Sequence, residues 1–279
     1  MIDYGLFGTI LIIINIAFSY KGFTNTLFFE AYKFEVDKVL INKDYLRLIS
    51  SGFLHTNWNH LIFNMLSLYF FSGPLENQVG GLNFLLIYFT SLIAGNLFAL
   101  IIHKNHGDYC AVGASGAICG IIFASIALFP SMEIGLLLLP FSVPGWLFGI
   151  LYIAYTFFGI KTQKDNIGHE AHLGGALIGM LVAIIIQPSA LKENYPTIIL
   201  ILLPSVFLIA LFIKKPHVLL IETSFKKIPT KYYDIDHKYN EEKKNKEIEL
   251  DELLEKINKK GIYNLSKKER QRLDELSSQ

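Results

Sequence analysis

The sequence predicts an all-α fold: a polytopic bundle of transmembrane helices followed by a soluble helical tail. Of the 279 residues, 52% are hydrophobic and only 18% are charged, whereas a soluble domain averages about 25% charged residues. The apolar residues also gather in segments close to the ~20 residues that a helix needs to cross a membrane. Composition and segment length therefore both favour an integral membrane protein.

Seven segments are predicted to span the membrane, six forming a core and the last an additional span. They are residues 5–20, 58–73, 82–102, 115–129, 144–160, 169–187 and 196–213. The first lacks the basic start of a cleaved signal peptide, so we interpret it as a retained span. The fourth is short and is followed by Pro130, which favours a helix that begins below the membrane surface, under a water-filled recess.

The chain is predicted to divide into a membrane core over 1–190, an extra transmembrane helix over 191–215, and a charged linker with a short helical tail over 216–279. The last of these holds 14 of the 25 Lys and Arg residues and 13 of the 24 Asp and Glu residues. Residues 248–257 have apolar side chains at helical spacing, with Gly261 as the expected C-cap. Ser266 and Glu269 have the spacing of a capping box at the start of a second helix. The net charge of +1 gives no basic field for a nucleic-acid partner.

Four polar residues inside the predicted spans are candidates for function: His60, Asn64, Ser115 and His172. Burying an unpaired polar group costs ~1–3 kcal/mol, so polar residues retained within a membrane usually have a task. All four lie near the starts of the second, fourth and sixth spans. Because even-numbered spans cross the membrane in the same direction, these residues are expected to lie at a similar depth and to converge.

Pairs of glycines follow two of these residues. Gly116 and Gly120 form a GxxxG pattern just after Ser115, and Gly175 and Gly179 form another just after His172. Small residues at this spacing let two helices approach closely. If the two faces meet, Ser115 and His172 come within hydrogen-bonding reach as a nucleophile and its general base.

The remaining polar residues complete this hypothesis or compete with it. His60 and Asn64 are spaced i,i+4 on one helix face and could donate to the oxyanion that attack on a carbonyl creates.

No carboxylate is placed to orient His172, since Glu170 is only two residues away and points elsewhere on a helix. A structural serine bonded to its own helix is the plainer interpretation of Ser115 alone. A zinc site on His169, Glu170 and His172 is disfavoured because their H-E-x-H spacing lacks a third ligand.

Three motifs together resemble the rhomboid intramembrane serine proteases. They are GASG at 113–116, HLIFN at 60–64 and AHLGGALIG at 171–179, and the similarity extends over about residues 40–187. The resemblance implies Ser115 as nucleophile, His172 as base, and His60 and Asn64 as oxyanion donors together with the Ser115 backbone amide. It also implies structural support from Gly113, Gly116, Gly120, Gly175, Gly179 and Arg47, and it places His55 in the first loop and Glu76 after the second span.

Two positions depart from the family pattern. Leu46 precedes Arg47 where the family usually has tryptophan, and Cys119 lies one turn after Ser115 where an aromatic residue often stacks on the base. The orientation of His172 is therefore expected to depend on other packing.

The function implied is a serine endopeptidase that cleaves transmembrane segments of membrane proteins in the lipid bilayer. It would need no cofactor and no metal, and it would reside in a bacterial cytoplasmic membrane. The family places the active-site loops outside the cell, whereas eight Lys and Arg residues in those loops favour the cytoplasmic side.

The alternative function is a non-catalytic protein that binds client helices, for which an intact serine and histidine would be unusual. A transporter is disfavoured because no internal repeat is visible.

Overall fold

The structure is a computed structural model of the whole chain. It describes residues 5–135, 142–162 and 167–214, together with residues 256, 257, 266, 269, 270, 272 and 273. The chain divides into two compact units, Met1–Glu222 and Thr223–Gln279, and each is described by itself.

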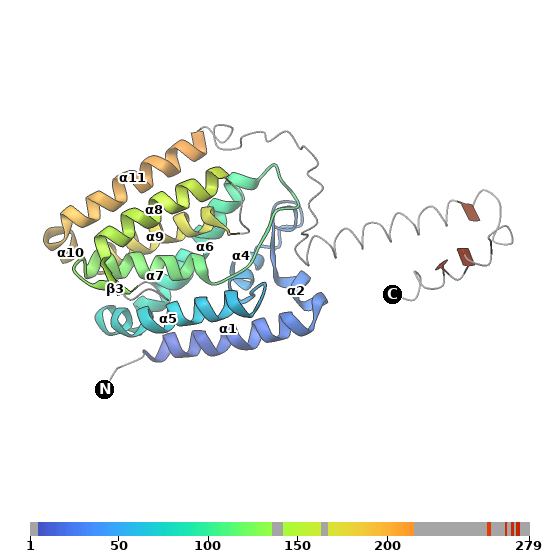
Figure 1. Cartoon of the computed structure of the whole chain (residues 1–279), viewed down its shortest axis with the longest axis horizontal. Helices are drawn as coiled ribbons and strands as arrows, with labels where there is room; N and C mark the ends of the chain where they lie inside the picture. The colour runs from blue at the N-terminus through green and yellow to red at the C-terminus, as the bar shows by residue number, and fades with distance from the viewer. Residues whose placement is uncertain are drawn as a thin grey trace. The chain divides into compact units, whose positions relative to one another are not determined.

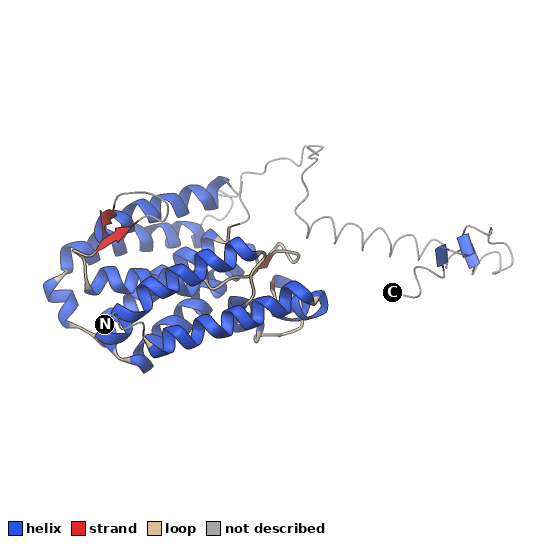
Figure 2. Cartoon of the chain, turned by 60° about the horizontal axis from the view of Figure 1, so that its bottom comes forward, coloured by secondary structure: helices blue, strands red, loops and turns tan. Residues whose placement is uncertain are grey.

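The described part of the first unit is helical, which confirms the predicted all-α bundle. Its strands form two short antiparallel pairs, β1 with β2 and β3 with β4, which lie at opposite ends of the helices (Figure 2). In chain order, the elements are α1 (Leu6–Thr24), α2 (Thr26–Tyr32), β1 (Phe34–Glu35), α3 (Val36–Leu40), α4 (Arg47–Ser50), the 3-10 helix η1 (Ser51–Phe53), α5 (Trp58–Val79), α6 (Gly81–His103), β2 (Cys110–Ala111), α7 (Ser115–Leu128), β3 (Glu133–Gly135), β4 (Ser142–Pro144), α8 (Gly145–Thr162), α9 (His169–Ile186), α10 (Ser189–Glu193) and α11 (Tyr195–Lys214).

Seven of the described helices coincide with the seven predicted spans. Four of them contain a stretch long and apolar enough to cross a membrane: Leu6–Thr24, Gly81–His103, His169–Ile186 and Tyr195–Phe212. The helices α5 and α8 have 22 and 18 residues but fall outside this group, and α7 is apolar but shorter.

Helix α7 is the centre of the bundle, with α5 and α1 on one side and α8 and α11 on the other (Figure 1). All of its residues after Ser115 are buried. Its 14 residues span ~21 Å at 1.5 Å per residue, which is less than the ~30 Å hydrocarbon core of a bilayer. At least one end of α7 must therefore lie within the depth of the membrane.

Side chains from other helices complete the backbone hydrogen bonding at helix ends. The Nδ2 atom of Asn194 donates to the carbonyls of Ala127 and Leu128, at 2.9 and 3.3 Å, and so caps the C-terminal end of α7. At the start of α1, both carboxylate oxygens of Glu76 accept from the amide of Phe7 at 3.1 Å. A carboxylate at a helix N-terminus is favoured by the exposed amides and by the helix dipole. The predicted acid after the second span thus anchors the first helix to α5.

Within the second unit, the predicted capping box is confirmed. The amide of Ser266 donates to Glu269 at 2.8 Å, and the amide of Glu269 donates to the Ser266 hydroxyl at 3.3 Å. The hydrogen bond from Lys256 holds the pKa of Glu269 down at about 2. Most of the predicted linker and tail, including Gly261, lies outside the described residues.

Candidate active site

Ser115 and His172 lie side by side at the starts of two neighbouring helices. Ser115 is the first residue of α7, and His172 is in the first turn of α9. The His172 Nε2 atom is 2.6 Å from the Ser115 Oγ atom, across 57 positions of sequence. Ser115 is half-buried and His172 is buried. The pair has the separation that proton transfer from a hydroxyl to an imidazole requires.

Glycines let α7 and α9 come close enough to form this pair. A methyl group placed on Gly175 would collide with the carbonyl oxygen of Gly116, and one placed on Gly179 would collide with the backbone of Gly120. Gly120 also lies against Ser91 of α6, so that a side chain there would have no room. The two GxxxG faces therefore meet one another directly, with α6 against both helices.

The second ring nitrogen of His172 has a partner that the sequence did not reveal. The His172 Nδ1 atom is 3.0 Å from the hydroxyl of Tyr152 on α8, and that hydroxyl is 3.0 Å from the Cys119 sulfur. The only sequence signal for this arrangement was the small Cys119 one turn after Ser115. The tyrosine on another helix could not be selected from among several aromatic residues in 144–160.

His60 and Asn64 face the loop that leads into α7. Gly113 has a φ of +126°, a conformation that side chains disfavour, and a methyl group on it would lie 2.7 Å from the His60 Nε2 atom and 3.7 Å from the Asn64 Nδ2 atom. His60 Nδ1 is 3.2 Å from the Thr56 hydroxyl. Asn64 is buried, and its Nδ2 atom has no hydrogen-bond partner in the described part of the chain. Two side chains with N–H groups therefore lie beside the backbone two residues before Ser115.

The three polar side chains of the H-E-x-H pattern, His169, Glu170 and His172, do not all point in one direction. The Glu170 carboxylate lies 3.1 Å from His103 Nε2 at the end of α6, and His103 stacks on Tyr109 with ring centroids 3.7 Å apart. His169 packs against Gly159 and the ring of Tyr155 on α8. Glu170 therefore points to α6, whereas His169 and His172 both contact α8, with their ring centroids 6.1 Å apart.

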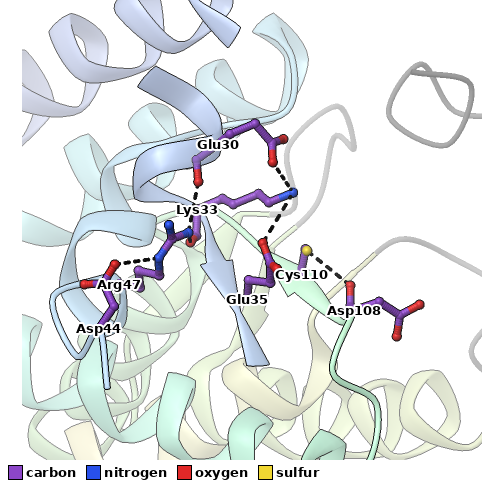
Figure 3. A network of polar contacts seen from close by, with 7 residues as sticks. All are labelled: Glu30, Lys33, Glu35, Asp44, Arg47, Asp108 and Cys110. Carbon is purple, nitrogen blue, oxygen red and sulfur yellow. Dashed lines mark hydrogen bonds and ion pairs between the residues drawn. The ribbon is translucent and has the colours of Figure 1, made fainter. Parts of the chain in front are cut away.

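Arg47 organises the first loop and does not contact the Ser115–His172 pair. Its guanidinium donates to the Asp44 carboxylate at 2.8 Å and to the carbonyls of Glu30 and Lys33 at 3.0 and 2.7 Å (Figure 3). Burial lowers the pKa of Lys33, but the hydrogen bond to Glu30 together with the electrostatic interactions with Cys110, Glu30 and Glu35 outweighs this and holds the pKa above the ordinary value. These contacts fix the chain between α2 and α4.

Two connections join the first loop to the segment before Ser115. β1 pairs with β2, where Glu35 lies opposite Cys110, and the amide of Gly113 donates to the carbonyl of Ser51 at 3.0 Å. The loop that Arg47 holds thus sets the backbone that precedes the serine. Burial raises the pKa of the Cys110 thiol to about 11, so this cysteine stays protonated at neutral pH.

His55 packs edge-on against the ring of His60. It is fully buried, its Nδ1 atom is 2.8 Å from the Ser19 hydroxyl, and its ring centroid is 4.8 Å from that of His60. Burial, with a smaller contribution from His60, lowers the pKa of His55 to about 3. His55 is therefore neutral at physiological pH.

Comparison with known proteins gives two family matches. The family described as Rhomboid domain matches residues 42–189, which is more than half of the chain, and the family described as Family of unknown function (DUF6576) matches residues 233–279. The first match covers every helix that carries a candidate site residue, and the second covers most of the tail.

Individual relatives agree with the first match. Rhomboid protein 1, mitochondrial, of Saccharomyces cerevisiae is 33% identical over 174 residues, covering 59% of this chain and 50% of the relative. RHOMBOID-like protein 12, mitochondrial, of Arabidopsis thaliana is 32% identical over 150 residues, covering 48% of this chain and 44% of the relative. Rhomboid protease GluP of Bacillus subtilis is 28% identical over 162 residues, covering 58% of this chain and 30% of the relative. The chain thus spans half or less of the length of these three relatives.

The family match covers helices α5 to α9, and with them the short helix α7 and its glycine contacts with α9. The apolar helices of the chain, together with the family match, make it an integral, multi-pass membrane protein. On the match over residues 42–189, this chain belongs to the rhomboid family.

Proposed function

We propose that this protein is a serine endopeptidase that cleaves peptide bonds within the transmembrane segments of other membrane proteins. The observation that carries the proposal is the 2.6 Å approach of His172 Nε2 to Ser115 Oγ. A serine hydroxyl is a weak nucleophile until a base takes its proton, and a neutral imidazole at hydrogen-bonding distance is such a base. Membership of the rhomboid family supports the same activity.

The reaction proceeds in two halves. His172 Nε2 takes the hydroxyl proton as Ser115 Oγ bonds to the carbonyl carbon of the substrate. The tetrahedral intermediate collapses when the C–N bond breaks and His172 returns the proton to the leaving amine, which leaves an acyl ester on Ser115. Water, deprotonated by His172, then hydrolyses the ester and frees the serine.

The carbonyl oxygen becomes an oxyanion in each half and requires donors that are already in place. His60, Asn64 and the backbone amide of Ser115 supply them in this proposal. The buried Nδ2 atom of Asn64 supports this role because it is unpartnered in the described structure. Losing one such donor typically raises the barrier by ~2.7–4 kcal/mol.

The substrate is a transmembrane helix that enters from the lipid and unwinds next to Ser115. A helix must unwind because its carbonyls are shielded by its own side chains and hydrogen bonds. Unwinding is easiest at glycine or other weak helix formers, which leave the helix at lower cost. The proposed chemistry needs no cofactor. The location of the protein in a bacterial cytoplasmic membrane, and the placement of its active-site loops outside the cell, stay predictions.

A cleavage assay in proteoliposomes tests the proposal. The protein is reconstituted with a fluorescent substrate made of one transmembrane helix carrying a central Gly-Gly pair, and Ser115→Ala and His172→Ala are assayed in parallel. We expect cleavage by the wild type and none by either variant. Cleavage that persists in folded Ser115→Ala would contradict the proposal. The client-binding alternative predicts that the wild type retains the substrate helix intact.

A further inference from the structure

We propose that Tyr152 is the positioning residue for His172, and this inference rests on the endopeptidase function proposed above. The Tyr152 hydroxyl lies 3.0 Å from the His172 Nδ1 atom, within hydrogen-bonding distance. Tyr152 belongs to α8, whereas Ser115 and His172 belong to α7 and α9. A third helix therefore supplies the orienting group.

The direction of the hydrogen bonds follows from the chemistry. To act as a base, the Nε2 atom of His172 must be unprotonated and accept from the Ser115 hydroxyl, 2.6 Å away. A neutral imidazole then carries its hydrogen on Nδ1. That N–H must donate, so the Tyr152 oxygen acts as its acceptor. A hydrogen-bond partner at one ring nitrogen sets the tautomer and hence the nitrogen that reacts.

Cys119 directs the tyrosine hydroxyl into this role. The Tyr152 oxygen is 3.0 Å from the Cys119 sulfur. If the phenol hydrogen lies toward the sulfur, the oxygen lone pairs are free to face His172. Sulfur is a weak acceptor, but Cys119 is buried, so water does not compete with it. The three groups form a chain in which the imidazole donates to the phenol and the phenol donates to the thiol.

Packing holds the tyrosine ring from two sides. It stacks on Phe148 with ring centroids 5.7 Å apart and an interplanar angle of 17°, and it meets Phe123 of α7 edge-on at 5.8 Å. An aromatic pair contributes ~0.5–1.5 kcal/mol beyond its buried area. The hydroxyl is thus placed by packed aromatic rings, with little freedom to turn away from His172.

Cys119 and Tyr152 are complementary in size. Cys119 lies one helical turn after Ser115, at the position expected to carry an aromatic ring against the base. A cysteine there is small enough to admit a tyrosine ring from α8. The structure thus offers a physical reason for the departure seen at Cys119: the orienting aromatic group comes from another helix and bonds the imidazole edge.

The tyrosine also supports His172 after proton transfer. When His172 becomes an imidazolium, the bond from Nδ1–H to the Tyr152 oxygen becomes charge-assisted and stronger. The acceptor is neutral, unlike the carboxylate of a serine–histidine–aspartate triad. Because the acceptor lies on α8, the Ser115–His172 pair is fully oriented only while α8 packs against α7 and α9.

The test compares Tyr152→Phe with Thr156→Val, which removes from the same helix a buried hydroxyl that has no hydrogen-bond partner in the described structure. The rate of labelling by a fluorophosphonate probe is measured in detergent. Removing the hydrogen-bond partner that orients a metal-ligating histidine typically costs 10- to 100-fold in metal affinity or activity, and an effect of the same size is expected for His172. We expect Tyr152→Phe to label about 10- to 100-fold more slowly and Thr156→Val to label at the wild-type rate. In substrate cleavage, Tyr152→Phe should lower kcat and leave KM unchanged.

The tautomer of His172 is a readout that a merely structural role would not change. ¹⁵N NMR of histidine-labelled protein, with the His172 signals assigned by their loss in His172→Gln, distinguishes the two ring nitrogens. We expect the wild type and Thr156→Val to carry the hydrogen on Nδ1, and Tyr152→Phe to show a mixture of tautomers. If Tyr152→Phe does not fold, Cys119→Ala should show a smaller loss of labelling rate, and Cys119→Ser should restore it.

Failure of the inference differs from failure of the proposed function. Tyr152→Phe with an unchanged labelling rate and an unchanged tautomer would overturn the inference while Ser115 stayed reactive. Wild-type protein with its hydrogen on Nε2 would overturn it as well. A folded wild type that the probe does not label would instead count against the proposed function, and the NMR comparison would still decide the role of Tyr152.

Discussion

Gly175 of α9 and Gly116 of α7 are in backbone contact, so that a methyl group on Gly175 would collide with the Gly116 carbonyl oxygen. Each glycine lies within three residues of a member of the proposed catalytic pair, Gly116 after Ser115 and Gly175 after His172. The distance between these two backbones therefore controls the distance between the serine and the histidine.

Gly175→Ala should destabilise the protein and weaken the pair. The added methyl group must push α7 and α9 apart, and overpacking of this kind typically costs ~1–3 kcal/mol. We expect a lower thermal unfolding midpoint in detergent and slower fluorophosphonate labelling. Gly135→Ala is the control because no atom of the described residues lies within 4 Å of a methyl group there. Equal unfolding midpoints for the two variants would contradict the close contact.

Asn64→Ala should slow catalysis and leave the fold intact. The Nδ2 atom of Asn64 makes no hydrogen bond in the described structure, so its loss breaks no native contact of that kind, while the oxyanion loses a donor. We expect kcat to fall about 100- to 1000-fold, measured with the transmembrane substrate in proteoliposomes. Asn83→Ala serves as control, since the Asn83 side chain, on α6, donates to the carbonyl of Val79 at the end of α5 and not to the Ser115–His172 pair. Unchanged kcat in Asn64→Ala would remove this residue from the proposed oxyanion site.

Stability should fall in acid partly through His55. Burial lowers its pKa to about 3 in the folded protein, whereas an unfolded histidine titrates near 6.5. The folded state thus binds fewer protons between these values, so its contribution is complete above about pH 6.5 and is lost as the pH falls toward 3. The slope approaches ~1.4 kcal/mol per pH unit in this window.

His55→Asn isolates this contribution. Asparagine retains a polar atom near the Ser19 hydroxyl but does not titrate. We expect the unfolding midpoint of the variant to fall less steeply than that of the wild type between pH 6.5 and 4. Parallel curves for the two proteins would show that His55 does not remain neutral in the folded state.

The sequence indicated most of what places the four polar residues. The four residues lie near the starts of even-numbered spans, and their convergence followed from the single assumption that alternate spans run in the same direction. The GxxxG patterns identified the helix faces that meet. These patterns are local and periodic, so they can be recognised in the sequence without knowledge of how the helices pack. The family match is consistent with the motifs from which the resemblance was drawn.

Tyr152 escaped prediction for a physical reason. Its role depends on the rotation and depth of α8 relative to α7 and α9, which no local pattern encodes. Several aromatic residues occupy residues 144–160, and any of them could have faced lipid, as half-exposed Tyr155 partly does. The partner of Glu170 was missed in the same way, because His103 reaches it from the far end of another helix.

The seven-span prediction also shows the limits of composition. Helix α5 lies at the predicted position but is not among the helices apolar enough to qualify as spans. It carries His60 and Asn64, which belong to the proposed site, and Glu76, which binds the start of α1. Polar residues needed for contacts within the bundle thus weaken the very signal by which a span is recognised.

The most direct measurement is labelling of the purified, folded protein with a fluorophosphonate probe, followed by mass spectrometry of the labelled peptide. The probe reacts only with a serine whose hydroxyl is activated. We predict one labelled site, Ser115, in the wild type and no labelling in Ser115→Ala or His172→Ala. An unlabelled wild type, or label on another serine that persists in Ser115→Ala, would contradict a catalytic pair formed by Ser115 and His172.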